Sequence, residues 1–184
     1  LEDARIAAQE QAFTDTLTGL TNRRALDHLL ERQRQSAEPF ALLHLDLDRF
    51  KEINDRHGHA MGDHVLQVVA RRMQGQVRAN DVIARVGGDE FVVVLLGADA
   101  AEGLVNAAAR LIATIEQPIV QAGQVCHISA SIGATLSRFY AAPGIADMMA
   151  DADRALYAAK AGGRGCHVMH DPGACAAPIL RGAG

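Results

Sequence analysis

The sequence predicts an α+β domain, built on a mostly antiparallel sheet with helices packed against it. The predicted elements occur in the order strand, helices, hairpin, helix, strands, helix and strand, rather than in strict βαβ alternation. Two apolar runs flank Gly87-Gly88, a pattern typical of a β-hairpin. Residues 128–134 alternate Ile and Ala with Ser and Gly, which indicates a strand with one packed face.

Each element follows from the spacing of its apolar residues and from the residues that bound it. Helices carry apolar residues three or four positions apart, strands carry continuous or alternating ones, and Pro39 and Pro118 each end a helix. In chain order, the predicted elements are helices at 1–13 and 22–36, a strand at 40–47, helices at 49–54 and 62–74, strands at 82–86 and 91–96, a helix at 99–116, two strands within 119–136, a helix at 145–161 and a strand at 166–169.

The domain organisation that we expect is simple. Residues 14–170 form one domain, a linker helix at 1–13 precedes it, and a flexible tail rich in Ala, Pro and Gly follows at 171–184. The linker helix leaves two interpretations open, because its apolar stripe is weak and no heptads are sustained. It is either a solvated lead-in helix or the end of a coiled coil from an upstream sensor domain.

Composition excludes several classes of protein. A net charge of −4 argues against broad binding to nucleic-acid backbones. No apolar run reaches the roughly 20 residues that span a bilayer, and no signal-peptide pattern is present. The three cysteines form no close pair, which favours a reducing, cytoplasmic setting. Because the chain opens with Leu1 rather than Met, we expect a piece of a longer protein, with any membrane anchor outside this segment.

Acidic residues lie at the ends of two predicted strands. Asp46 and Asp48 end the apolar run at 40–47, and Asp89 and Glu90 lie at the tip of the hairpin. If these strands are neighbours, the carboxylates of Asp46 and Glu90 point to the same edge of the sheet. Such hard oxygen ligands suit Mg²⁺ or Mn²⁺, which can activate a hydroxyl and hold charge on a phosphate. Taken one at a time, each acid could equally be an ordinary solvated turn residue.

Five blocks of sequence resemble one protein family. Residues 85–91 read Arg-Val-Gly-Gly-Asp-Glu-Phe and contain the motif that names the GGDEF diguanylate cyclase domains. Four further blocks occur in the family's order, at 15–24, 46–63, 131–133 and 155–164, so the resemblance covers roughly residues 13–169. It implies a five-stranded, mostly antiparallel sheet flanked by helices, with the ferredoxin-like core of adenylyl cyclases and polymerase palms.

The resemblance also implies an activity. A homodimer would condense two GTP molecules into cyclic di-GMP and two pyrophosphates, with two Mg²⁺ or Mn²⁺ ions at each site. Asp46, Glu90 and the backbone carbonyl of Leu47 match the metal ligands. Asp89 matches the proposed base for the attacking 3′-hydroxyl, although it could instead be an acid beside the metal site without that role.

Further residues match the family's substrate contacts. Asn54 and Asp63 match the guanine-reading pair, since a carboxylate can accept from the guanine N–H donors that adenine lacks. Without the resemblance, they would be read as helix-end residues. The other matches are the peptide N–H groups of Phe50 and Lys51, the close backbone approach at Gly88, and the cationic side chains of Lys51, Lys160 and Arg164. Gly165 departs from the family, which usually has Asn there.

Arg78 and Asp81 match the Arg-x-x-Asp motif of the family's inhibitory site, which implies feedback by cyclic di-GMP. The alternative is a loop ion pair. The main rival function is a non-catalytic module that binds GTP or cyclic di-GMP, and the others are a cyclase with a different product and a pure interaction domain. A zinc site at His57, His59 and His64 is not favoured, because the spacing matches no zinc pattern.

Overall fold

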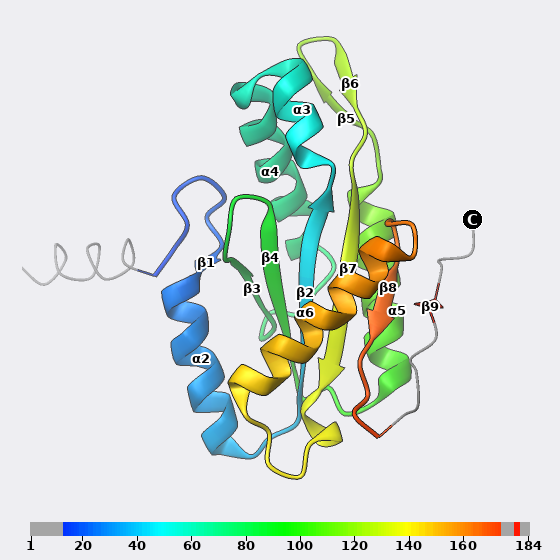
Figure 1. Cartoon of the computed structure of the whole chain (residues 1–184). Coiled ribbons are helices and arrows are strands. Elements are labelled where there is room, and N and C mark those ends of the chain that lie inside the picture. The colour runs from blue at the N-terminus through cyan, green and yellow to red at the C-terminus, as the bar shows by residue number, and fades with distance from the viewer. Residues whose placement is uncertain (1–12, 174–178, 181–184) are drawn as a thin grey trace, which may run out of the picture.

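A computed structural model describes residues 13–173 and 179–180 (Figure 1). The predicted linker helix at 1–13 therefore lies almost wholly outside the described residues. The elements are β1 (Thr21–Asn22), α2 (Arg23–Ser36), β2 (Phe40–Asp48), α3 (Phe50–His57), α4 (His59–Gln74), β3 (Val82–Arg85), β4 (Glu90–Leu96), α5 (Ala101–Ile115), β5 (Ile119–Gln121), β6 (Gln124–Cys126), β7 (Ser129–Leu136), the 3₁₀ helix η1 (Ser137–Phe139), α6 (Ile145–Ala161), β8 (His167–Met169) and β9 (Ile179–Leu180).

The main sheet has the strand order β1-β3-β4-β2-β7-β8-β9. β2 pairs antiparallel with both β4 and β7, and β3 pairs antiparallel with β4, whereas β8 lies parallel to β7. The predicted α+β fold is confirmed, and the inner order β3-β4-β2-β7 is that of a ferredoxin-like βαββαβ core. Besides the five predicted strands, the sheet has a two-residue strand at each edge, β1 and β9. β9 lies within the tail that was predicted to be loose.

The region 119–136 differs from the prediction of two strands. β5 and β6 form a separate two-stranded sheet, and β7 is a third strand that joins the main sheet. The turn between β5 and β6 is tight because Ala122 and Gly123 both take positive φ values, 49° and 78°. The sequence pattern did not show where β6 ends and β7 begins, because both segments have the residue pattern of a strand.

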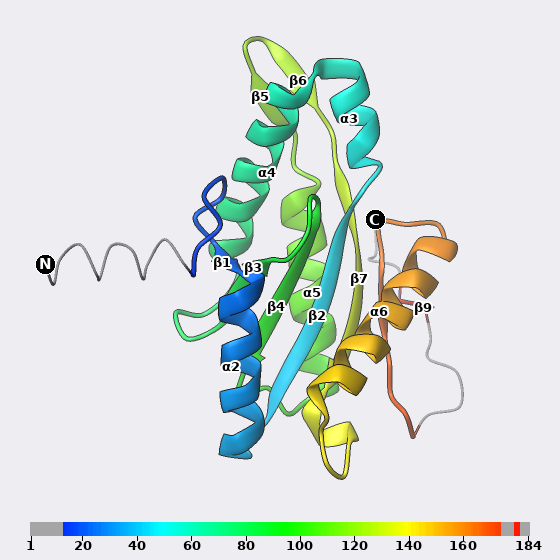
Figure 2. The same cartoon turned by 60° about the vertical axis from the view of Figure 1, so that its left-hand side comes forward.

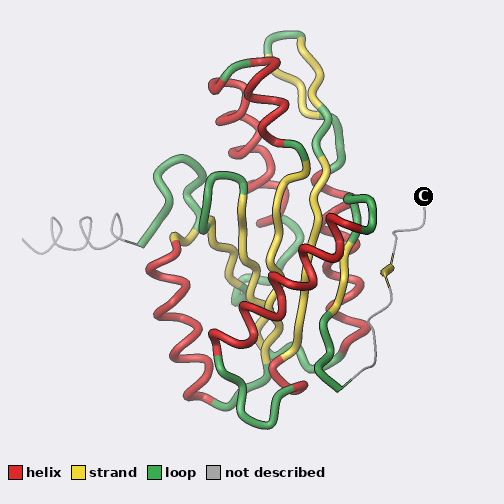
Figure 3. Tube along the Cα trace, in the orientation of Figure 1, coloured by secondary structure: helices red, strands yellow, loops and turns green. Residues whose placement is uncertain are grey.

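Helices cover both faces of the main sheet (Figures 1, 2 and 3). α2 and α6 pack on one face, where Leu26 of α2 and Met148 of α6 join Leu42 of β2 in one apolar cluster. α4 and α5 pack on the other face around Leu43 and Leu45. Because side chains alternate along a strand, the even-numbered residues of β2 face α6. This alternation directs Asp46 and Asp48 toward the α6 side.

α6 lies unusually close to the sheet at Gly133 of β7. A Cβ atom on Gly133 would stand 2.0 Å from the Ala152 carbonyl oxygen and 2.1 Å from the Leu156 nitrogen. Only glycine allows this backbone contact, so the position of α6 over the sheet is fixed. None of the helices in the described part of the chain has the length and apolar character needed to cross a membrane.

Candidate active site

Asp46 and Glu90 are direct cross-strand partners. Asp46 lies near the carboxyl end of β2, Glu90 is the first residue of β4, and the two pair in register. In an antiparallel pair, opposite residues project from the same face with their Cβ atoms roughly 5 Å apart. Two carboxylates at that spacing repel each other unless a cation lies nearby, so this pair is chemically suited to hold a divalent metal.

Cations from the end of α6 lie against the acids of β2. The Lys160 ammonium stands 2.8 Å from Asp46 Oδ2, and Arg164 Nε lies 4.0 Å from Asp48 Oδ1. Asp48, to which sequence reasoning assigned no role, is buried and fully engaged. It accepts from Ser131 Oγ at 2.7 Å and from the Gly165 backbone nitrogen at 2.9 Å.

The backbone conformation at position 165 explains why Gly can stand where the family usually has Asn. Its φ is +58°, in the left-handed region that Gly and Asn adopt more readily than most residues. The same turn places Arg164 beside Asp48. The substitution therefore preserves the turn that joins the end of α6 to the end of β2.

The hairpin tip is shaped around the Glu90 carboxylate. A Cβ on Gly87 would stand 2.8 Å from Glu90 Oε2, so a side chain here would displace the acid from its observed position. A Cβ on Gly88 would meet nothing within 4 Å, so Gly88 is open to an approaching ligand. The Leu47 backbone nitrogen donates to the Asp89 carbonyl at 3.1 Å, which joins the tip to the end of β2.

The Asp89 carboxyl is electrostatically crowded. Burial and the negative charge of Asp46 raise its pKa above the ordinary aspartate value, and Glu90 contributes in the same direction. A raised pKa makes a carboxylate a better proton acceptor, which is the property a general base requires. The structure thus gives Asp89 a suitable environment for that role.

Gly62 leaves room for the Asn54 side chain between α3 and α4. A Cβ on Gly62 would stand 1.9 Å from Asn54 Oδ1 and 3.2 Å from the Phe50 ring, so the Asn54 side chain lies directly over Gly62. Asp63, the next residue, is exposed in the first turns of α4. Lys51 is exposed and Phe50 is buried in α3. The Asn54 side chain thus packs against α4 one residue before Asp63.

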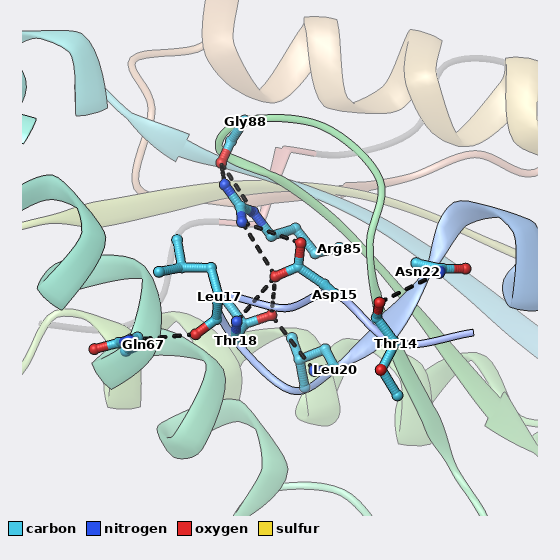
Figure 4. A network of polar contacts seen from close by, with 9 residues as sticks. All are labelled: Thr14, Asp15, Leu17, Thr18, Leu20, Asn22, Gln67, Arg85 and Gly88. Atoms are coloured by element: carbon cyan, nitrogen blue, oxygen red, sulfur yellow. Dashed lines mark hydrogen bonds and ion pairs between the residues drawn. The ribbon is translucent and has the colours of Figure 1, made fainter. Parts of the chain in front are cut away.

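A contact that sequence reasoning missed holds the hairpin tip (Figure 4). Arg85 donates to both Asp15 carboxylate oxygens, at 3.1 and 3.2 Å, and to the Gly88 carbonyl. Thr18 also donates to Asp15 from its backbone and its hydroxyl. Burial acts to raise the pKa of Asp15, but these hydrogen bonds outweigh it and hold the pKa below the ordinary value. The signal was available, since Asp15 and Arg85 lie within two matched blocks.

Arg78 and Asp81 lie apart from the other predicted residues. They occupy the loop before β3, at the opposite end of the β3–β4 hairpin from the Gly87–Glu90 tip. One Asp81 oxygen accepts from the Arg78 backbone nitrogen at 2.8 Å and the other from the Leu96 nitrogen at 3.0 Å. No Arg78–Asp81 side-chain ion pair is among the contacts of the described residues, and the Arg78 side chain is exposed.

A cavity of about 650 Å³ lies on another side of α3. It is bounded by α3, the segment 125–129 and the turn 163–165, and it includes Asp48 and Arg164 but neither Asp46 nor Glu90. Among the described residues, no group of three or more His, Cys, Asp and Glu side chains is arranged to hold a metal. The Asp46–Glu90 pair would thus rely on a backbone carbonyl, water and phosphate oxygens, which suits Mg²⁺.

Comparison with known proteins identifies the family of this chain. The family model described as "Diguanylate cyclase, GGDEF domain" matches residues 12–166. The chain belongs to the GGDEF diguanylate cyclase family. It is 41% identical over 170 residues to diguanylate cyclase TpbB of Pseudomonas aeruginosa, covering 90% of this chain and 39% of TpbB. The chain thus spans about two fifths of the length of that GGDEF protein.

Solved GGDEF structures have the same fold. A structure of TpbB from P. aeruginosa that comprises only the GGDEF domain superposes with a TM-score of 0.78 at 41% identity, covering 83% of this chain and 91% of that one. The coiled coil and GGDEF domain of DgcB from Caulobacter crescentus, solved in complex with c-di-GMP, gives a TM-score of 0.82 at 28% identity, covering 89% of this chain and 88% of that one.

Proposed function

We propose that this GGDEF domain is a diguanylate cyclase. It condenses two GTP molecules into cyclic di-GMP and two pyrophosphates. The observation that carries the proposal is the in-register pairing of Asp46 with Glu90, beside the Lys160 ammonium. A non-catalytic binding module has no need for two carboxylates held against each other at a sheet edge, where each disfavours the other's charge.

The chain's own residues would hold GTP at both ends. The guanine would lie at the Asn54–Asp63 pair, whose oxygens accept from the N1 and N2 donors of the base. The triphosphate would lie over the backbone N–H groups of Phe50 and Lys51, at the amino end of α3, where helix geometry favours anions. Lys51, Lys160 and Arg164 would add positive charge, and the open face of Gly88 would allow close backbone approach.

The acids would serve a divalent cation and a proton transfer. Asp46, Glu90 and the Leu47 carbonyl would hold Mg²⁺ or Mn²⁺, with two ions at each site. Bound metal lowers the pKa of an attacking hydroxyl and offsets charge that develops on phosphate oxygens. Asp89 would accept the proton of the 3′-hydroxyl, an assignment supported by its raised pKa. Each 3′-oxygen then attacks the other molecule's α-phosphorus, and pyrophosphate leaves.

A cyclic dinucleotide needs two such domains. Each would bind one GTP, and the two would face each other as a two-fold symmetric homodimer, since the product has that symmetry. Residues 14–170 would be the catalytic domain, and residues 1–13 a linker through which an upstream sensor controls pairing. With GTP as its substrate, the reaction would take place in the cytoplasm. Arg78 and Asp81 would form an inhibitory site for cyclic di-GMP.

Turnover of GTP with product identification tests the proposal. The wild-type domain should convert GTP to cyclic di-GMP with Mg²⁺ or Mn²⁺. Glu90→Gln should lose at least about a hundredfold of this rate, since it removes one charged metal ligand. Glu102→Gln, an exposed position on α5, is the matched control and should retain the rate. A wild-type dimer that binds GTP yet makes no cyclic di-GMP would refute the catalytic assignment.

A further inference from the structure

The Lys160–Asp46 ion pair is sheltered and joins two elements far apart in sequence. Lys160 lies in the last turn of α6, and its side chain is 32% exposed, whereas that of Asp46 is 13% exposed. The ammonium lies 2.8 Å from an oxygen that the proposed function assigns to a divalent metal. Lys160 is also the residue assigned there to the triphosphate. One ammonium thus has two potential anionic partners at the same site.

The acids around Asp46 need a cation before any ligand arrives. Asp46 faces Glu90 across the strands, and Asp89 is the residue that precedes Glu90 at the hairpin tip. In the part of the chain that the structure describes, Lys160 is the cation in an ion pair with Asp46. The ammonium therefore offsets negative charge where the metal would otherwise do so.

We propose that Lys160 competes with the divalent metal for Asp46, and that the GTP phosphates remove this competition by drawing the ammonium away. The inference rests on the proposed function and deepens it. A cation of charge +2 placed on Asp46 would repel an ammonium held at contact distance, so each disfavours the other. A nucleotide that moves Lys160 onto its phosphates makes Asp46 available, and metal and GTP then bind cooperatively.

The structure confines this exchange to a side chain. α6 packs backbone to backbone on β7 at Gly133, where there is no room even for a Cβ. Lysine has a flexible four-carbon stem with a single charged end, so its ammonium can change partners while its Cα stays in place. Arg164 is different, because the Asp48 beside it is already held by Ser131 and Gly165.

Metal binding without nucleotide tests the proposal. Mn²⁺ affinity is measured by electron paramagnetic resonance of the free ion, for the wild-type chain, Lys160→Met and Arg164→Gln. Met keeps the apolar stem and removes the charge, so Lys160→Met should bind Mn²⁺ about tenfold more tightly than wild type. Arg164→Gln loses the same charge nearby but does not touch Asp46, and it should change Mn²⁺ affinity by less than about twofold.

A second variant separates competition from a change in folding. Lys160→Arg keeps a cation beside Asp46 and should leave Mn²⁺ affinity near the wild-type value, with an unchanged thermal midpoint. Unaltered or weaker Mn²⁺ binding by Lys160→Met would overturn the competition. This result is distinguishable from failure of the proposed function, because the measurement involves no nucleotide. A domain with cyclase turnover but no tightening in Lys160→Met would retain the function and refute only the competition.

Discussion

Acidic residues at the two ends of the β3–β4 hairpin have opposite surroundings. One end is the tip at 87–90, and the other, called the far end below, is where Asp81 precedes β3. At the far end, both Asp81 oxygens accept from backbone nitrogens within the same hairpin and its preceding loop. At the tip, Asp46 and Glu90 face each other across strands, and the ion pair of Asp46 is with a mobile type of side chain, Lys160. An acid whose oxygens accept hydrogen bonds from nearby backbone N–H groups stabilises the fold. An acid that faces another acid and lacks such bonds is available to bind a ligand.

The largest effects are expected when an acid is replaced by the matching amide, at Asp46 near the tip and at Asp81 at the far end. Asp46→Asn should lower GTP turnover by at least about a hundredfold, because a metal ligand loses its charge. Its thermal midpoint should be unchanged or raised, since like charges at the tip are reduced. Asp81→Asn should retain turnover but lose about 0.5–1.5 kcal/mol of unfolding free energy, because one of its two backbone donors loses its acceptor. Turnover assays and denaturant titrations measure both.

The contrast would fail if the two variants behaved alike. A loss of stability in Asp46→Asn comparable to that in Asp81→Asn would mean that Asp46 is a structural residue. Loss of turnover in Asp81→Asn with stability retained would give the far end a catalytic role that its hydrogen bonding does not suggest.

Replacing a glycine at each end, Gly87 at the tip and Gly97 at the far end, tests the same contrast through the backbone. Gly87→Ala would bring a Cβ within 2.8 Å of the Glu90 carboxylate, so the acid must move. We expect roughly a tenfold loss of turnover, since small displacements of catalytic groups are costly. Gly97, past the end of β4, has a φ of +71° and open space around it, so Gly97→Ala should instead cost about 1–2 kcal/mol of stability with turnover retained. Equal turnover in both variants would argue against the shaping of the tip around Glu90.

Arg78→Ala tests what the far end binds. The Asp81 carboxylate is engaged with backbone, so recognition of a product there depends mainly on the exposed Arg78 guanidinium, which can donate to guanine acceptors in pairs. The concentration of cyclic di-GMP that halves turnover should rise about tenfold, while the uninhibited rate stays near wild type. Arg71→Ala, at an exposed position of α4, is the matched control. Unchanged inhibition in Arg78→Ala would remove the feedback site from this loop.

The sequence was informative where chemistry and local pattern coincide. α6 was predicted with its observed bounds, because a long apolar stripe ends cleanly at Gly162-Gly163. The acids at strand ends identified Asp46 and Glu90 before any pairing was known. α4 begins at His59 rather than near residue 62, because Gly58, with a φ of +83°, ends α3 and allows a new helix at once. Helical apolar spacing alone does not locate such a break.

Long-range contacts were beyond reach of the sequence. The burial of Asp48 depends on Ser131 and Gly165, which come from two other elements, and no periodicity reports such a meeting. The same holds for the collision that a side chain at Gly62 would cause with Asn54. Sequence supplies candidates for a site, whereas strand register and helix packing decide which candidates meet.

Asp15 holds the tip from outside the hairpin, through its ion pair with Arg85. The pKa of Asp15 is lower in the folded protein than its ordinary value of 3.8, so the charged carboxylate stabilises the fold above that pH. Asp15→Asn should therefore reduce the free energy of unfolding at pH 7 by about 1–3 kcal/mol. The difference should shrink as the pH falls through the lowered pKa, where the wild-type carboxylate becomes protonated. Denaturant titrations at several pH values measure this, with the exposed Asp27→Asn on α2 as control. If the difference in unfolding free energy between wild type and Asp15→Asn stayed the same at the lowest pH, Asp15 would act through its shape and not through its charge. The contrast between the tip and the far end would then rest on Asp46 and Glu90 alone.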